Sequence, residues 1–556
     1  MRLVNGIAAS YHPRSLGVAL RESTSAHPDK AAVILGQDTF TYSDLESRAR
    51  STARGLLALG VKPGARIAVW LPNSIEWLAT AMGTGMIGAI LVPVNLRYRT
   101  EEAEYILSQS GAEVVLVTDQ VAGTDYAAMI SSICPELLTA TPATVRSRTL
   151  PGLRQVISTA PSRLPGVRPF GELAELAAQV SEERLDEVIA AVDPESVCQI
   201  QYTSGTTARP KGAMLTHNSI LRDSYEICQI MRIGEDDVLF SALPFFHVAG
   251  YVSAALCTLS MGATLVTGSH FDALQALQLI ERHRCTIIRG VETMFVMMMA
   301  HPDFERHDVS SLRGGVCGSY TETVLREVYR KMGIRELTSV FGLSETSSAS
   351  CMARVEDPLE VRLTTNGRPL PGVEMRIIDP TSGKPLPHDQ RGEIVIRGWN
   401  VMKGYYEKPV ETAEALDAEG WLHTGDLGFI DQDGNLHFLD RIKDVIKVGG
   451  ENVSAAEVES YLYRHHKIEI CQIVAVPDAR LAEVGAAYVK LKPGQECTAE
   501  EIIDFCKGSI ASFKVPRYVF FTDTFPITGS GKIQKFVLRD QARRDVAALN
   551  AQKSPA

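Results

Sequence analysis

One stretch of the chain combines hydroxyl groups, glycines and a cation in a single loop. It runs Tyr202-Thr-Ser-Gly-Thr-Thr-Ala-Arg-Pro-Lys-Gly212, directly after a β-type run and before a helical pattern. Its hydrogen-bond donors, flexible positions and cation are Ser204, Gly205, Thr206, Thr207, Lys211 and Gly212. Such a loop can surround a phosphate with donors. It is not a Walker loop, which requires G-x-x-x-x-G-K-[ST]. We therefore predict phosphate binding, with a polar strand-to-helix turn as the alternative.

Two further segments place single carboxylates among small residues. Val340-Phe-Gly-Leu-Ser-Glu-Thr346 sets Glu345 after a strand-like run, where it could hold magnesium on a nucleotide. Gly420-Trp-Leu-His-Thr-Gly-Asp-Leu427 is expected to set Asp426 in a tight turn, where a carboxylate could accept both hydroxyls of a ribose. Each segment alone is weak evidence, because such carboxylates are common in proteins.

Two glycine-containing segments near the C-terminus carry lysines. One is Leu439-Asp-Arg-Ile-Lys-Asp-Val-Ile-Lys-Val-Gly-Gly-Glu-Asn452, and the other, Pro526-Ile-Thr-Gly-Ser-Gly-Lys-Ile533, puts Lys532 on a flexible loop. Taken singly, the first could be a linker and the second a surface turn.

The composition is that of a large, folded protein. The 556 residues correspond to three or four folding units at about 150 residues each. With 56 basic against 66 acidic side chains the net charge is −10, so no basic excess favours nucleic acid as a partner. The ten cysteines form no C-x-x-C pair and no Cys/His cluster at zinc spacing, which indicates a reduced, cytoplasmic chain.

The start of the chain has no apolar run long enough for a secretory signal. Two segments, Trp77–Val94 and Val238–Phe271, are apolar enough to imitate membrane spans. Both contain Gly, Ser or Thr and Pro, so we interpret them as buried strand-turn-helix segments rather than as transmembrane helices.

Strand-like and helical patterns alternate along most of the chain. From Lys30 to Asp119, and again after Ser196, short β-rich runs are separated by helical patterns, which predicts an α/β fold with doubly wound parallel sheets, two in number. Between them, Leu138–Gly171 lacks any period and is expected to be an irregular surface connection.

After Leu363 the pattern changes to short strands and turns, which predicts a β-rich subdomain. A charged and then glycine-rich boundary follows at Arg441–Gly450, and beyond it we expect a compact α+β domain of roughly 110 residues. The last dozen residues are polar or Ala-rich and are expected to fray.

Together, and in this order, these motifs resemble those of the adenylate-forming superfamily, in its acyl-CoA synthetase branch; the superfamily also includes coumarate-CoA ligases, luciferase and the adenylation domains of peptide synthetases. The resemblance covers nearly the whole chain. It implies a large N-terminal domain of two doubly wound sheets and a β-barrel, and a small mobile α+β C-terminal domain. The implied bounds are 1–440 for the N-terminal adenylation domain, 441–443 for the hinge and 444–556 for the C-terminal domain.

The resemblance also implies roles for individual residues. The catalytic set is Lys532, Glu345, Thr206 and His247, with Mg²⁺ on Glu345 and Thr206 and the hinge at Lys443. ATP and coenzyme A would be bound by Thr203, Ser204, Gly205, Thr206, Thr207, Lys211, Gly318, Ser319, Phe341, Gly342, Ser344, Asp426, Arg441, Lys447, Gly449 and Gly450. The acid pocket would consist of His247, Gly290, Val291, Glu292, Ser319 and Tyr320.

Three positions depart from the family pattern. Ala208 stands where relatives usually have Gly, which could stiffen the loop and weaken ATP binding. Glu292 occupies a position that is commonly Pro, and its carboxylate either faces a polar group of the substrate or is solvated. Tyr320 replaces a small residue and would shorten the acid pocket.

The function implied by the resemblance is acid–CoA ligation with ATP, Mg²⁺ and coenzyme A, producing AMP and pyrophosphate. Loading of a carrier-protein thiol and a weakened binding protein that keeps the fold remain as alternatives. Amino-acid-activating relatives usually have Asp where this chain has His247, so an α-amino acid is disfavoured. Medium- or long-chain fatty, aryl and alicyclic acids all remain open, as does assembly into a homodimer.

Overall fold

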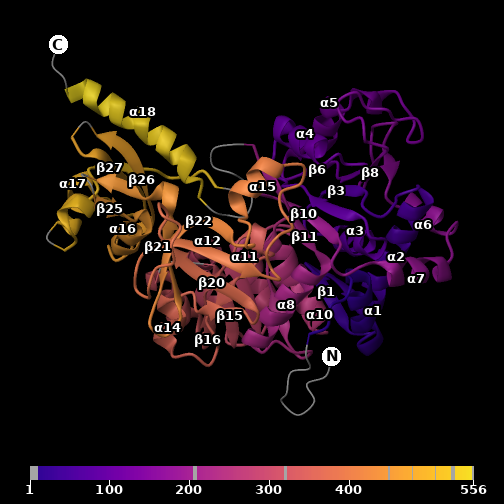
Figure 1. The fold of residues 1–556 in the computed structure, drawn as a ribbon, viewed down its shortest axis with the longest axis horizontal. Helices are drawn as coiled ribbons and strands as arrows, with labels where there is room; N and C mark the ends of the chain where they lie inside the picture. Colours follow the sequence, from indigo (N-terminus) through magenta and orange to yellow (C-terminus); the bar gives the residue numbers. More distant parts are fainter. Residues whose placement is uncertain are drawn as a thin grey trace.

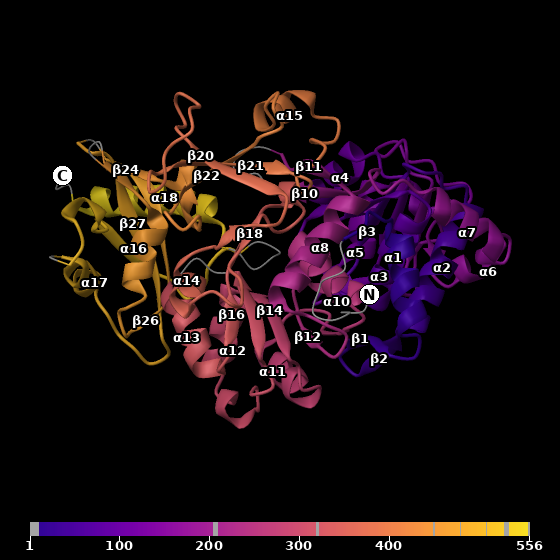
Figure 2. The same cartoon turned by 60° about the horizontal axis from the view of Figure 1, so that its bottom comes forward.

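The computed structural model divides into a large N-terminal part and a small C-terminal part (Figure 1). The structure describes residues 11–203, 209–318, 322–448, 451–478, 480–507, 509–527 and 533–553. The large part has two layered α/β lobes followed by small antiparallel sheets, and the small part lies at one end of the molecule in both views (Figures 1 and 2). The predicted fold class is confirmed.

The first large sheet has seven strands in the order β11-β10-β4-β3-β5-β8-β9. Their bounds are β3 Arg66–Trp70, β4 Ile90–Pro93, β5 Val114–Val117, β8 Gln155–Ser158, β9 Arg168–Pro169, β10 Val197–Thr203 and β11 Lys211–Thr216. All pairings are parallel except that of β10 with β11. The predicted irregular connection at Leu138–Gly171 is therefore wrong in part, because β8 extends the parallel sheet beside β5.

The second large sheet also has seven strands, in the order β16-β15-β14-β12-β13-β1-β2. Their bounds are β1 Ala31–Leu35, β2 Asp38–Thr41, β12 Val238–Phe240, β13 Thr264–Thr267, β14 Ile287–Val291, β15 Gly314–Gly318 and β16 Glu336–Thr338. Here β1 pairs with β13, so the N-terminal hairpin joins strands more than 200 positions later in the chain.

Helices pack on both faces of each sheet. The layer between the sheets contains α2 Tyr42–Ala58, α3 Ile75–Met86 and α8 His217–Met231, whose side chains share one core with Ile67 of β3 and Leu239 of β12. The outer faces are covered by α4 Thr100–Gln109 and α5 Tyr126–Ile133 on one sheet, and by α11 Ala273–Arg282, α12 Glu292–Ala300 and α13 Glu322–Met332 on the other. The shared inner core holds the two lobes together.

The remaining helices of the large part are short or peripheral. Among them are α1 Leu16–Ala26, α6 Glu172–Ala177, α7 Glu182–Ala191, α9 Val248–Gly250, the π-helix η2 Tyr251–Leu256, α10 Cys257–Ser260, α14 Leu359–Thr364 and α15 Pro409–Ala415, with the 3₁₀ turns η1 Pro135–Leu138 and η3 Phe304–Arg306. Of the helices in the described ranges, none is both long and apolar enough to cross a bilayer. The segment Trp77–Val94 contains α3 and β4, and Val238–Phe271 contains β12, β13 and the helical turns between them, as expected.

The predicted β-rich subdomain consists of two small antiparallel sheets. One contains β17 Val340–Phe341, β18 Cys351–Met352 and β19 Arg368–Pro369, and the other contains β20 Val373–Ile378, β21 Gly392–Gly398, β22 Leu422–Ile430 and β23 Leu436–Arg441. Asp426 lies within β22, not in a tight turn as predicted. It is buried and aligned with Leu422 and Thr424 in the alternating pattern of that strand, so sheet pairing overrides the turn signal of Gly425.

The C-terminal part is a five-stranded sheet covered by three helices. Its strands are β24 Ile446–Val448, β25 Glu451–Val453, β26 Ile468–Asp478, β27 Ala482–Leu491 and β28 Tyr518–Phe521, and its helices are α16 Ala455–Leu462, α17 Ala499–Cys506 and α18 Lys535–Lys553. The expectation that the last dozen residues fray is wrong for those that the structure describes, because α18 continues to Lys553 and Val546 is buried against the sheet with Leu538 and Ala542.

A buried ion pair joins α18 to α16. Lys535 Nζ lies 2.8 Å from Glu459 Oε1, and the backbone N–H of Ile473 donates to the same oxygen at 2.7 Å. Burial acts to lower the pKa of Lys535, but the attraction of Glu459, Asp440 and Asp444 keeps it above its ordinary value. Each charge therefore satisfies the other inside the small part.

Removal of one partner of this pair should destabilise the C-terminal part. We expect Lys535→Met to lower its free energy of unfolding by about 3 to 5 kcal/mol, because Glu459 would remain buried without its cation. The measurement is calorimetric unfolding of the whole chain. The matched control is Lys507→Met, since Lys507 pairs with Asp504 at the surface. If Lys507→Met lowered the free energy of unfolding as much as Lys535→Met, the stabilising role given to the Lys535–Glu459 pair would be contradicted.

Candidate nucleotide and acid site

A cavity of about 1540 Å³ lies where the large and small parts meet. On the large part it is lined by residues at the carboxyl ends of parallel strands, among them Thr203 of β10, Gly290 and Val291 of β14 and Gly318 of β15. The small part contributes Ile527 and residues 533–536. The carboxyl ends of parallel strands are the usual place for ligands in open α/β sheets.

The two ends of the hydroxyl-rich loop are held together by strand pairing. Thr203 pairs with Lys211 across β10 and β11, and the Thr203 hydroxyl donates to the Lys211 carbonyl at 3.3 Å. The Lys211 ammonium lies 4.3 Å from the centre of the Tyr405 ring. The loop therefore begins and ends at the cavity wall, with its lysine stacked on an aromatic ring.

Tyr405 connects this lysine to the predicted magnesium ligand. Its hydroxyl donates to Glu345 Oε1 at 2.8 Å. Burial raises the pKa of Tyr405, and the neighbouring Glu345 carboxylate raises it further, so the phenol keeps its proton and remains a donor. The backbone of Glu345 is fixed as well, because the Met402 N–H donates to its carbonyl at 2.8 Å. Lys211 and Glu345 thus lie on the same wall of the cavity.

The backbone before Glu345 requires glycine. At Gly342 an added Cβ would lie 1.9 Å from the Ser348 carbonyl oxygen, closer than any side-chain atom could approach. Val340, Gly342, Leu343 and Ser344 all line the cavity. Phe341 does not, since its ring is buried and stacks on Phe438 with 5.6 Å between ring centres. The segment therefore presents backbone and small side chains to a ligand.

Asp426 and Arg441 are directly opposite each other on β22 and β23. The Arg441 Nε lies 2.7 Å from Asp426 Oδ1, and Asp426 is 2% exposed whereas Arg441 is 44% exposed. Arg441 and the neighbouring Gly425 line the cavity. Asp426 itself is not a lining residue, so its carboxylate fixes Arg441, and the Arg441 cation at the cavity wall is suited to hydroxyl and phosphate groups.

Several predicted acid-pocket residues also line the cavity. His247 lines the cavity, and its Nδ1 accepts the Ala249 N–H at 3.3 Å. Gly290 and Val291 lie beside Cys317 and Gly318 through the β14–β15 ladder. Glu292 follows Val291 but is not one of the lining residues. Burial raises the pKa of Tyr463 and of Cys471 in the small part, and the charge of Glu292 raises both further, so Glu292 lies near that part.

Other predicted residues stand elsewhere. Lys447 is exposed on β24, with its N–H bonded to Glu483, and does not line the cavity. Lys443 belongs to the short helix η5 Ile442–Asp444, directly after β23. Outside the described residues are Ser204, Gly205, Thr206, Thr207, Ala208, Ser319, Tyr320, Gly449, Gly450 and Lys532.

Sequence reasoning missed many residues of the cavity wall. Three that matter here are Tyr405, Glu393, which accepts the Gly425 N–H at 3.0 Å, and Arg289 in the middle of β14. Tyr405 and Glu393 stand among many exposed polar residues and had no local signal. Arg289 did have one, because a lone arginine within an apolar strand pattern is unusual.

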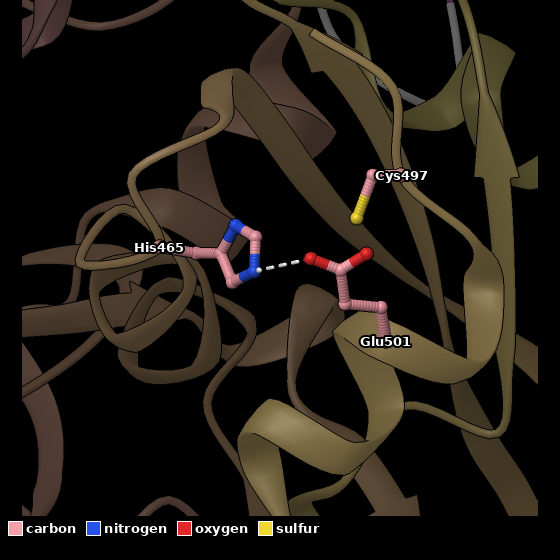
Figure 3. A group of neighbouring side chains, drawn as sticks. All are labelled: His465, Cys497 and Glu501. Atoms are coloured by element: carbon pink, nitrogen blue, oxygen red, sulfur yellow. Dashed lines mark ion pairs between the residues drawn. The ribbon is translucent and has the colours of Figure 1, made fainter.

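The fold also brings together three potential metal ligands that the sequence spacing did not indicate. His465, Cys497 and Glu501 of the small part have ligand atoms within 4.8 Å of one another (Figure 3). His465 Nε2 faces Glu501 at 3.7 Å, but Lys467 Nζ is closer to the same Glu501 oxygen, at 2.7 Å. Because Lys467 already balances this carboxylate, the cluster is explained as an ion-pair network.

Comparison with known proteins places the chain in a family. Residues 20–406 match the model of AMP-binding enzymes, and residues 457–532 match the model of the AMP-binding enzyme C-terminal domain. The chain belongs to the adenylate-forming superfamily, in its acyl-CoA synthetase branch. One similar protein is the putative acyl-CoA synthetase YngI of Bacillus subtilis, which is 38% identical over 95% of this chain and 97% of that protein. Another is the human mitochondrial medium-chain acyl-CoA ligase ACSF2, which is 36% identical over 96% of this chain and 88% of that protein.

Solved structures of related enzymes have the same fold. The anthranilate CoA ligase AuaEII in complex with anthranoyl-AMP superposes with a TM-score of 0.85 at 26% identity, covering 98% of this chain and 99% of that one. ATP-bound MatB from Rhodopseudomonas palustris superposes with a TM-score of 0.82 at 28% identity, covering 95% and 99%. These likenesses extend across both parts of the chain.

The Tyr405 hydroxyl should matter for ATP binding through the orientation of Glu345. We expect Tyr405→Phe to weaken the affinity for ATP in the presence of Mg²⁺ by about 10-fold or more, the usual loss when a group that orients an ion ligand is removed. Titration calorimetry measures it. Tyr406→Phe is the matched control, because Tyr406 makes its contacts with Gly212 and Gln109 through its backbone. Equal affinities for the two variants would contradict the role of Tyr405.

Proposed function

We propose that this AMP-forming acyl-CoA ligase couples a carboxylic acid to coenzyme A in two steps at one cavity. Acid and ATP first give an acyl-adenylate and pyrophosphate, and coenzyme A then displaces AMP to give the acyl-CoA. The observation that carries the proposal is the assembly of Lys211, Tyr405 and Glu345 on the wall of the cavity that Arg441 also lines, in a chain of the acyl-CoA synthetase branch.

The first step requires two anions to approach each other. A carboxylate oxygen attacks the α-phosphorus of ATP, the bond to the β-phosphate breaks, and pyrophosphate leaves. Since the carboxylate is itself the nucleophile, the protein needs only to neutralise charge and align the groups. Lys211 and the loop hydroxyls of Ser204, Thr206 and Thr207 would hold the β- and γ-phosphates, and Lys532 would approach the α-phosphate and the acid.

Mg²⁺ fits the chemistry of this wall. Glu345 offers a hard carboxylate oxygen beside Lys211, and Thr206 would add a hydroxyl. When bound, the ion supplies positive charge to the phosphate oxygens. Tyr405 keeps the Glu345 carboxylate in position, and Asp426 with Arg441 would hold the ribose.

The second step requires a different set of groups at the same carbon, which explains a mobile C-terminal part. We place the N-terminal domain at 1–440, the hinge at 441–443 and the mobile domain at 444–556. Support comes from residues 533–536, which follow Lys532 and line the cavity in this structure. In the orientation that the C-terminal domain would adopt for the second step, Gly449 and Gly450 would take the place of residues 533–536. Together with Lys447 they would line the passage for the pantetheine arm of coenzyme A.

For the acid, the pocket at His247, Gly290 and Val291 with Ser319 and Tyr320 accommodates a medium- or long-chain fatty, aryl or alicyclic acid. The decisive assay combines pyrophosphate release over a panel of acids with detection of the acyl-CoA. Pyrophosphate release that free coenzyme A does not turn over would favour a carrier-protein thiol as the acceptor instead. No release with any acid would contradict the proposal.

The two lysines proposed for the two steps should produce separate defects. Lys532→Ala should reduce pyrophosphate release by about 100-fold or more, the loss expected for a main electrostatic donor, but should still convert supplied acyl-adenylate and coenzyme A to thioester. Lys443→Pro fixes φ near −65° at the hinge, so adenylation should persist and thioester formation should be lost. Single-turnover assays of each half-reaction measure both; equal loss of both halves in folded Lys532→Ala would refute this division.

A further inference from the structure

Arg289 is a buried cation in the wall of the acid side of the cavity. It lies in the middle of β14, is 6% exposed and lines the cavity. Side chains alternate along a strand, and Ile288 packs into the outer core with α11 and α12. Arg289 therefore points with Ile287 to the inner face of the sheet, toward the layer that contains α8.

A buried arginine normally has its nitrogens paired. Arg362, which is 8% exposed, shows the usual arrangement, since its guanidinium donates to the carbonyls of Asp357, Arg335 and Leu337. Around Arg289 no carboxylate oxygen of the described residues lies within 4.0 Å of a nitrogen, and its guanidinium donates to no described acceptor. Its charge is therefore not matched by the surrounding part of the chain.

Three ionisable groups act on the charge of Arg289, and none of them is a carboxylate within ion-pair distance of its guanidinium. They are Cys257 of α10 and Asp223 and Cys228 of α8. Burial raises the pKa of Asp223 well above its ordinary value, which favours the neutral carboxyl, and likewise raises that of the Cys228 thiol. Asp223 Oδ2 already accepts the Ala349 N–H at 2.8 Å. The charged residues Lys211, Glu345 and Arg441 elsewhere on the cavity wall are not among the groups that act on Arg289.

Two serines add hydrogen-bonding capacity to the same wall. Ser253 Oγ and Ser348 Oγ are 2.6 Å apart, and both residues line the cavity with Arg289 and His247. Ser253 comes from η2 and is fully buried, and Ser348 follows η4 Ser344–Thr346. An arginine and hydroxyl groups in one wall match a carboxylate, whose oxygens accept several hydrogen bonds.

We infer that Arg289 binds a second carboxylate at the far end of the acid, so that the preferred substrates are dicarboxylic acids activated at the opposite carboxyl group. This inference rests on the proposed acid–CoA ligation. The substrate would supply a carboxylate within ion-pair distance of Arg289, which the described residues do not provide, and the charge pair would be enclosed when the acid enters. A monocarboxylic acid of equal length would leave the cation buried and unpaired.

The test compares pyrophosphate release from matched acid pairs, namely hexanoic with hexanedioic, octanoic with octanedioic and decanoic with decanedioic acid. The unmodified enzyme should show a higher kcat/KM for the diacid of at least one pair. Arg289→Met should reverse that preference. Its kcat/KM for the diacid should fall by roughly 100-fold, as when one partner of other charge pairs is truncated, and its kcat/KM for the monoacid should rise. Arg289→Lys should retain part of the preference.

The control is Arg222→Met, on α8 beside Glu226 and outside the cavity lining, which should leave the diacid-to-monoacid ratio unchanged. If Arg289→Met does not fold, two other measurements still test the inference. One is the diacid-to-monoacid ratio of kcat/KM for Arg289→Lys. The other is whether the diacid raises the melting temperature of the unmodified enzyme more than the monoacid does. Equal or better use of monoacids by the unmodified enzyme, or an equal loss on both acids in the variant, would overturn the inference while leaving acid–CoA ligation intact. Absence of pyrophosphate release with every acid would instead refute the proposed function.

Discussion

The structure is organised around the repulsion between two anions that must react. A carboxylate approaches the phosphates of ATP only where positive charge and hydrogen-bond donors are already in place, since water excluded from a cavity no longer screens them. The parallel sheets provide that place because their strands end at a common edge, with Thr203, Gly290 and Gly318 at the cavity wall. Lys211, held by pairing of β10 with β11, brings the first cation.

The same constraint accounts for the small C-terminal part. Its cavity-lining residues 533–536 come from the start of α18, a helix fixed to its own sheet by apolar packing and by the Lys535–Glu459 pair. In the proposed mechanism such a unit would carry Lys532 toward the phosphates or withdraw it as a whole, and the movement would occur at the short segment after β23.

The two parts of the chain differ in how a buried cation is paired. In the small part Lys535 has a carboxylate at 2.8 Å, so burial and pairing come together in the folded chain. In the large part Arg289 is also buried, but the groups of α8 and α10 that act on it are thiols and a carboxyl whose neutral form burial favours. The first pair stabilises the fold, whereas the unmatched arginine is suited to select a ligand.

The sequence by itself determined the local elements and the motifs. The 3.6-residue period of α2 and α3, the apolar runs of β3 to β5 and the hydroxyl-rich loop are all properties of neighbouring residues, which is why they were predictable. Only the tertiary structure decided that β1 pairs with β13, that Asp426 lies in a strand, that Leu538, Ala542 and Val546 of α18 pack against the small sheet, and that Tyr405 joins Lys211 to Glu345. These depend on contacts between residues far apart in the chain, and burial and pairing there outweigh the weak conformational preference of any single segment.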